Sequence, residues 1–200
     1  MKYPAIHVKQ LTGSEPILDD NGMPVATTLD FWRWAYSDLL GNTERGAVAE
    51  YLVASALGIS REDRISWNSY DLLSKEGIKV EVKASAYIQT WAQERLSDIR
   101  FGIQPTFAWN AETNEYDTVM RRQSDIYVFC VLKHTDQETI DPLDARQWDF
   151  YPLRTCVLNE KVGNQKGISL SKVQKLGAQK TTYSELRDRI VELWKLSVKS

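Results

Sequence analysis

The stretch GIKVEVKAS, residues 77–85, alternates apolar and charged side chains. Val80 and Val82 take every second position, and Glu81 and Lys83 follow each of them in turn. Successive side chains of a β-strand point to opposite faces, so the valines share one face and the two charges share the other. The pattern predicts a strand whose apolar face packs in a core. Its charged face is either solvated or part of a site.

A partner strand is expected just before this one. Residues 64–85 contain two strand-like runs around a KEG turn at residues 75–77, which predicts a β-hairpin. Asp71 precedes Glu81 by ten positions, so a hairpin closed at this turn places the two acids in neighbouring strands near the same end. Glu81 and Lys83 are two residues apart and share a face. The hairpin therefore gathers two carboxylates and one ammonium group.

This combination of side chains suits phosphoryl chemistry. Oxygen ligands from Asp and Glu suit Mg²⁺, which lowers the pKa of a bound water and offsets charge on phosphate oxygens. A lysine beside the metal orients the attacking water or adds positive charge in the transition state. Clustered acids without a cation would repel one another, and one of them would stay protonated. A divalent cation resolves that repulsion.

A third acid lies in an apolar helix upstream. The run TERGAVAEYLVASALG, residues 43–58, predicts a helix that ends at Gly58, and Glu50 stands among its apolar and small side chains. Burying a carboxylate is costly unless it is paired or binds a metal. Glu50 is therefore expected either to form an ion pair, with Arg45 or Arg64 as candidates, or to join the metal site.

The hairpin charges also have a simpler interpretation. Alternating Val-Glu-Val-Lys is common on half-exposed strands, and an E-x-K pattern alone is weak, so the pair by itself favours a solvated face. Asp71 in register and Glu50 in an apolar helix shift the balance towards a site.

The rest of the chain supplies further helix and strand patterns. Together they predict an α/β fold with a mixed central sheet covered by helices. The expected elements are an arm or short hairpin over 1–27, a helix over 30–40 capped by Asp30, a helix or crossover over 87–99, a second hairpin within 101–123, strands over 124–134 and 148–158, a loop over 159–170, a helix from Ser171, and a last helix to residue 198 that begins at a Thr182–Glu185 capping box.

Composition restricts the class of protein. Two hundred residues with 42% hydrophobic content fit one domain with a real core. The net charge of −2 excludes a uniformly basic nucleic-acid-binding protein, so DNA binding would need local patches. Cys130 and Cys156 form no CxxC pair, which argues against zinc clusters and disulfides. No signal peptide or membrane-length apolar run occurs, so we expect a soluble, cytoplasmic protein.

Asp71, the Glu81-Val82-Lys83 element and the acid-bearing helix before them resemble the PD-(D/E)XK nuclease superfamily. Tyr70 stands where the motif has proline, so that half of the motif is reduced to its aspartate. The resemblance covers residues 43–134. It implies a restriction-endonuclease-like fold, with a four-stranded mixed sheet flanked by helices.

The resemblance also implies roles for these residues. Asp71, Glu81 and Glu50 would bind Mg²⁺, for which Mn²⁺ could substitute, and Lys83 would orient the nucleophile. Residues 1–27 would form an arm, and 28–200 a single nuclease-like domain with C-terminal helices over 171–198. If the hairpin register differs, Glu76 or Asp63 could replace Asp71.

Other residues are candidates for contact with DNA. Ser85 and Gln89 follow the motif lysine, where members of the superfamily place residues near the scissile phosphate. A stretch with five lysines and no acid follows from residue 161 to 180. In this stretch the candidates for contact with the phosphate backbone are Lys161, Lys166, Lys172 and Lys175.

We therefore expect a Mg²⁺-dependent DNA endonuclease of restriction or repair type, and analogy with the superfamily implies a homodimer. One alternative is a catalytically silent protein of the same fold that binds nucleic acid or acts as a scaffold. A second alternative is a structural domain whose acids only make ion pairs.

Overall fold

The computed structural model describes residues 3–4, 6, 8–64, 68–110 and 113–198. The helices are α1 (Thr28–Tyr36), α2 (Asn42–Ala56), η1 (Ala145–Gln147), α3 (Thr155–Val162), α4 (Leu170–Lys175), η2 (Tyr183–Glu185) and α5 (Leu186–Val198). The strands are β1 (Pro16–Leu18), β2 (Pro24–Thr27), β3 (Leu72–Leu73), β4 (Lys79–Ala86), β5 (Arg100–Gly102), β6 (Thr106–Asn110), β7 (Glu115–Arg121), β8 (Ile126–Leu132), β9 (Trp148–Arg154) and β10 (Gly167–Ser169).

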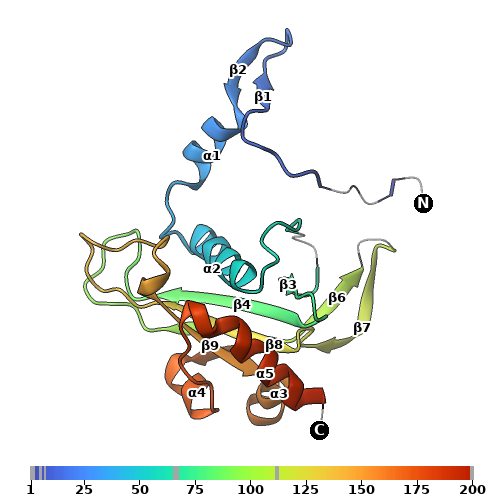
Figure 1. The fold of residues 1–200 in the computed structure, drawn as a ribbon, viewed down its shortest axis with the longest axis vertical. Coiled ribbons are helices and arrows are strands. Elements are labelled where there is room, and N and C mark those ends of the chain that lie inside the picture. Colours follow the sequence, from blue (N-terminus) through green and yellow to red (C-terminus); the bar gives the residue numbers. More distant parts are fainter. Residues whose placement is uncertain (1–2, 5, 7, 65–67, 111–112, 199–200) are drawn as a thin grey trace.

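A mixed sheet forms the centre of the molecule (Figure 1). Within the described residues it has four strands in the order β3-β4-β8-β9. The β3–β4 and β8–β9 pairs are antiparallel, and β4–β8 is parallel. The described strands outside this sheet form three short antiparallel pairs, β1–β2, β6–β7 and β5–β10. The α/β class and the expected mixed sheet with flanking helices are confirmed.

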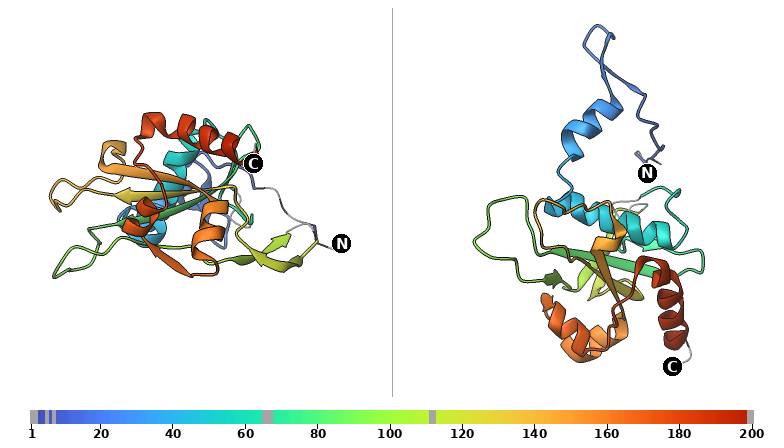
Figure 2. Two further views of the ribbon diagram at one scale, coloured as in Figure 1. Left: turned by 90° about the horizontal axis from the view of Figure 1, so that it is seen from below. Right: turned by 60° about the vertical axis from the view of Figure 1, so that its left-hand side comes forward.

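The two faces of the sheet bury separate cores. Val80 and Val82 of β4 lie in one core with α2 and α5, so the prediction that the valines share a buried face is confirmed. Tyr127 and Phe129 of β8 lie in the other core, with α3, α4, β5 and β10. Figure 2 shows α5 on one side of the sheet and α3 with α4 on the other. Glu81 and Lys83 alternate with the valines, so they belong to the second face.

Two elements differ from expectation between residues 148 and 170. The strand expected over 148–158 ends at Arg154, and the expected loop begins with helix α3. The sequence TCVLNEKV contains β-branched residues that suggested a continuing strand, but Thr155, Leu158 and Val162 are buried at helical spacing. The helical spacing therefore decided the structure of this segment.

The other elements differ less from the sequence predictions. Asp30 is not the cap of α1, because Thr27 is its N-cap and Asp30 completes a capping box by accepting from Thr27. Residues 87–99 form an irregular crossover rather than a helix. The hairpins β3–β4 and β6–β7 and the capping box before α5 are confirmed. No helix in the described ranges combines the length and apolar character needed to cross a membrane.

The β1–β2 hairpin and α1 project from the body (Figure 1). Trp34 of α1 is 85% exposed, and Met23 and Val25 of the hairpin are also exposed. The turn between the strands is acidic, with Asp19 accepting from the backbone of Met23. This projecting arm is an ordered unit with few apolar contacts to the sheet.

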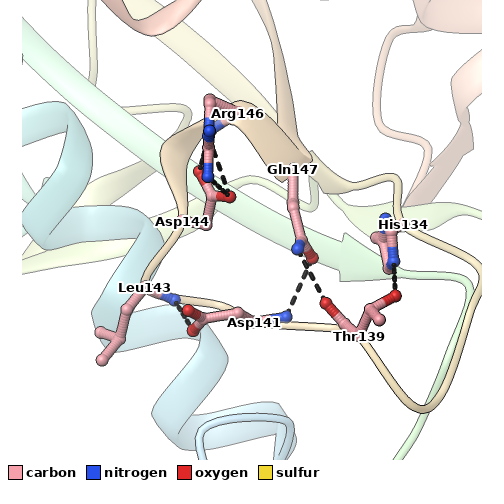
Figure 3. A network of polar contacts seen from close by, with 7 residues as sticks. All are labelled: His134, Thr139, Asp141, Leu143, Asp144, Arg146 and Gln147. Carbon is pink, nitrogen blue, oxygen red and sulfur yellow. Dashed lines mark hydrogen bonds and ion pairs between the residues drawn. The ribbon is translucent and has the colours of Figure 1, made fainter.

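The acidic loop between β8 and β9 is ordered by its own side chains (Figure 3). Gln147 bridges it, accepting from the Asp141 backbone N–H and donating to the Thr139 carbonyl at 2.9 Å each. Asp144 pairs with Arg146, and His134 bonds Thr139 at 2.7 Å. These acids satisfy local donors and turns, so the loop shows no sign of a ligand site.

Arg122 is buried and holds the loop before β10 against the chain entering β6. Its guanidinium donates to the Ile103 carbonyl at 2.7 Å, to Asn159 Oδ1 at 2.8 Å and to the Gly163 carbonyl at 2.8 Å. Burial lowers the pKa of this guanidinium. Arg122 is therefore a structural residue rather than part of an exposed basic patch.

Replacing Arg122 with methionine should lower the free energy of unfolding by about 3 kcal/mol, because buried carbonyl groups lose their donors. The neighbouring variant Arg121→Met is the matched control. Arg121 pairs with Asp117 at the surface, and its loss should cost less than about 1 kcal/mol. Urea denaturation measures both values, and equal losses would contradict a structural role for Arg122.

Candidate active site

The β3–β4 turn brings Asp71 beside β4. Leu72 pairs with Val80, so one further step places Asp71 opposite Glu81. Gly77 adopts φ +83° in the turn, a conformation that favours glycine. Asp71 Oδ2 accepts the Val82 backbone N–H at 2.7 Å. The predicted register is thereby confirmed, and it fixes the carboxylate against the strand.

Glu81 and Lys83, which are two residues apart on the same face of β4, form an ion pair. Glu81 Oε1 and Lys83 Nζ are 2.6 Å apart, and the two side chains are 18% and 32% exposed. A solvated strand face would leave both side chains mostly exposed. Both side chains are instead largely buried. The charged face of β4 is therefore a cluster of interacting side chains rather than a solvated strand face.

Helix α2 contributes Glu50. Its Oε2 accepts from Arg64 Nε at 2.6 Å, and the glutamate side chain is 16% exposed. Of the two arginines considered for it, Arg64 is the partner. Arg45 is buried elsewhere, where it donates to Asn42, to the Leu40 carbonyl and to Gln89. The Glu50–Arg64 hydrogen bond raises the pKa of Arg64.

Burial and the neighbouring charges shift the pKa values of Asp71 and Lys83 in the cluster. Burial raises the pKa of Asp71 to about 6, and the charges of Glu81 and Glu50 add to this rise against the opposing Val82 N–H and Lys83. Burial lowers the pKa of Lys83, but Glu81, Asp71 and Glu50 together outweigh it, so its pKa lies above the ordinary value. Lys83 therefore stays charged at neutral pH, whereas burial, with a smaller contribution from the neighbouring acids, makes ionisation of Asp71 unfavourable.

Tyr127 is a member of this cluster that the sequence did not reveal. It lies on β8 directly beside Glu81 in the parallel register. Burial raises the pKa of its phenol, and the charges of Glu81 and Asp71 raise it further. Tyr127 thus forms a neutral wall of the site. The pairing of two strands distant in sequence carries no local signal that could have identified it.

The donor chemistry of the site fits a hard divalent cation, because Asp71, Glu81 and Glu50 offer carboxylate oxygens, and because burial first and the neighbouring acids second raise the pKa of Asp71. Their positions form no closed ligand shell. Across the described ranges, no three His, Cys, Asp or Glu side chains gather as a metal-binding group. Glu81 and Glu50 are turned to Lys83 and Arg64, respectively.

The candidates for contact with DNA do not all lie in the cluster. Ser85 shares the face of Glu81 and Lys83 but is buried. Gln89 is also buried, accepting from Arg45 and donating to the Ala86 carbonyl at 2.9 Å, so its amide supports the crossover after β4. The exposed lysines lie on or near α3 and α4, across the sheet from α2; they are Lys161, Lys166, Lys172 and Lys175.

In a comparison with protein families, residues 27–172 match the model described as bacteriophage T4 endonuclease IV. The matched region contains the whole cluster on α2, β3, β4 and β8. The search of curated proteins returned no match. Because the family model covers more than half of the sequence, this chain belongs to the bacteriophage T4 endonuclease IV family of nucleases.

Proposed function

We propose that the protein is a Mg²⁺-dependent endonuclease that hydrolyses phosphodiester bonds in DNA, of the PD-(D/E)XK type with a restriction-endonuclease-like fold. The observation that carries the proposal is the grouping of Asp71, Glu81 and Lys83 on one hairpin. Glu50 of α2, paired with Arg64, adds a charge that Asp71 and Lys83 sense. Membership of an endonuclease family supports the reaction class.

In this proposal Asp71, Glu81 and Glu50 would hold Mg²⁺, with Mn²⁺ as a substitute. The ion, when bound, lowers the pKa of a water and offsets negative charge on the phosphate oxygens. The raised pKa of Lys83 keeps its ammonium group charged, so Lys83 acts as a hydrogen-bond donor rather than as a base. The Val82 N–H holds one carboxylate oxygen of Asp71 and fixes the side chain beside β4.

A role in restriction or repair, and the assembly of a homodimer, are the finer parts of this proposal. The alternatives are a binding or scaffolding protein of the same fold and a structural domain whose acids serve only as ion pairs. The observation that favours a structural domain is the presence of two ion pairs, Glu81–Lys83 and Glu50–Arg64. Titration with Mg²⁺ separates these alternatives.

Mg²⁺ should both activate cleavage and stabilise the fold. A ligand that binds only the native state raises stability by RT ln(1 + [L]/Kd), which is about 2.7 kcal/mol at a hundredfold excess over Kd. Differential scanning fluorimetry with MgCl₂, and with excess EDTA, measures the shift in Tm. Gel assays on circular DNA follow cleavage under the same conditions.

Cleavage that persists in excess chelator would contradict metal dependence. DNA binding without Mg²⁺ and without loss of substrate over time would indicate a silent binding protein. A Tm indifferent to Mg²⁺ would indicate that the acids serve as ion pairs alone.

A further inference from the structure

Helix α1 of the projecting arm is apolar on two opposite faces. On the inner face, Leu29 and Trp32 lie one turn apart, and both pack against Gly13 in the segment before β1. The Leu29 N–H also donates to the Gly13 carbonyl at 2.9 Å. On the outer face, Phe31 and Trp34 are likewise one turn apart, and they are 42% and 85% exposed. A helix with apolar side chains on all sides is normally buried on all sides, so the outer face needs a cover.

The arm has little to stabilise it without such a cover. Helix α1 has nine residues, and isolated helices shorter than about 12–15 residues are marginal in water. The β1–β2 pair is a two-stranded hairpin, which is also marginal alone. Figures 1 and 2 show the arm standing away from the sheet and its helices, so the body of the same chain does not cover it.

The exposed area of the whole chain is larger than a monomer of this mass should have. The chain exposes 13031 Å², whereas a folded monomer of 23.0 kDa is expected to expose roughly 9,600 Å². A standard protein–protein interface buries about 800 Å² from each partner, and obligate homodimers bury about 1,000–2,500 Å² from each. The surplus of about 3,400 Å² is therefore more than a stable dimer needs.

The charges of the arm favour a protein partner over DNA or an anionic membrane. Between Pro16 and Tyr36 the sequence has three acids and one base. Two of the acids, Asp19 and Asp20, form the turn at the far end of the arm, where they would repel phosphate groups. The remaining charges, Asp30 and Arg33, lie 3.8 Å apart and offset each other. Helix α1 is thus neutral, and two copies of it can approach without repulsion.

We infer that the partner is a second copy of this chain, and that the two arms pair through the outer faces of α1. In a two-fold arrangement, the commonest for homo-oligomers, Phe31 and Trp34 pack against the same residues of the other copy. An antiparallel pair also places the two acidic turns at opposite ends, where they do not repel each other. The inference rests on the proposed function in one respect, since it gives the homodimer named there its contact surface.

The test measures the assembly of the full chain without measuring cleavage. Analytical ultracentrifugation over a wide range of concentration should give a dimer of twice 23.0 kDa for the wild type. Trp34→Ala and Phe31→Ala should each raise the Kd of the dimer about a hundredfold or more, because the two-fold axis removes each ring twice. Trp34→Phe, which keeps a ring, should stay within about tenfold of the wild type.

Trp91→Ala is the matched control, because Trp91 is 53% exposed but lies in the crossover after β4, outside the arm. It should dimerise as the wild type does. Thermal melts test the same point in a second way. The Tm of the wild type should rise with protein concentration, and this dependence should be lost in Trp34→Ala while the variant still melts cooperatively.

A wild-type mass of 23.0 kDa at every concentration would overturn the inference. A dimer that tolerates both alanine substitutions in α1, or one that Trp91→Ala weakens equally, would overturn it as well. DNA binding that weakens in Trp34→Ala while the protein stays monomeric would assign the arm to nucleic acid instead. Failure of the proposed function is read separately from DNA cleavage: an inactive dimer would contradict only that function, and an active monomer only the arm pairing.

Discussion

Replacing Lys83 with alanine is expected to lower the rate of DNA cleavage by about 10²–10³-fold or more while the protein stays folded. Lys83 is the charged donor that stands two residues from Glu81 on the same face of β4. Its pKa lies above the ordinary value, so the ammonium group is present throughout the neutral range. Removing it withdraws positive charge from the place where a phosphate would accumulate negative charge.

The fold should survive because the side chain of Lys83 is partly exposed and contributes no apolar core contact. Lys133→Ala is a suitable control. Lys133 also forms a lysine–carboxylate pair, with Asp149 at 2.7 Å, but at the other end of β8. Initial cleavage rates, together with circular dichroism and thermal melts, measure the two effects. Undiminished cleavage by Lys83→Ala, or an equal loss in Lys133→Ala, would contradict the proposed role.

Replacing Asp71 with asparagine is expected to abolish cleavage and, without Mg²⁺, to stabilise the protein. The folded-state pKa of Asp71 is about 6, above its ordinary value of 3.8. Between these values the folded state binds a proton that the unfolded state has lost, so stability falls as pH rises through this window. Asparagine keeps an oxygen for the Val82 N–H but carries no charge. The variant should gain about 2 kcal/mol at pH 7 and almost nothing at pH 3.5.

With Mg²⁺ present, the wild-type protein should be more stable than the Asp71→Asn variant. The wild-type protein gains stability from the ion, whereas the variant has lost one of the three proposed ligands. Urea denaturation measures the free energy of unfolding of the wild type and of the variant at pH 3.5 and at pH 7, each with EDTA and with MgCl₂. Glu76→Gln is the control, since Glu76 pairs with Arg187 on the other side of the turn. A variant less stable than wild type at pH 7 in EDTA would show that the Asp71 charge supports the fold.

The local parts of the fold could be predicted from the sequence. The hairpin β3–β4 follows from alternation and one glycine turn, and α2 follows from an apolar run that ends before Gly58. The register that sets Asp71 opposite Glu81 depends only on the turn, so it was also predictable. The Thr182–Glu185 capping box likewise marked the last helix.

Features that depend on distant contacts could not be predicted. Tyr127 joins the site only because β8 pairs with β4 in parallel. Gln89 was a candidate for contact with DNA, yet it is buried and bonded to Arg45, which lies far away in the sequence. Helix α3 was missed because strand propensity outweighed a weak helical spacing. The choice of Arg64 over Arg45 as the partner of Glu50 likewise required coordinates.

The contrast between the β3–β4 turn and the parallel β4–β8 pairing bears on the order of assembly. The turn closes over the few residues between Leu73 and Lys79, so Asp71 and Glu81 meet through a local contact. Their burial awaits β8, which is reached only after the chain has passed through β5, β6 and β7. Long loops close later than short ones. We therefore expect folding to bring these acids together while they are still hydrated, so that their repulsion would oppose only the later pairing of β4 with β8.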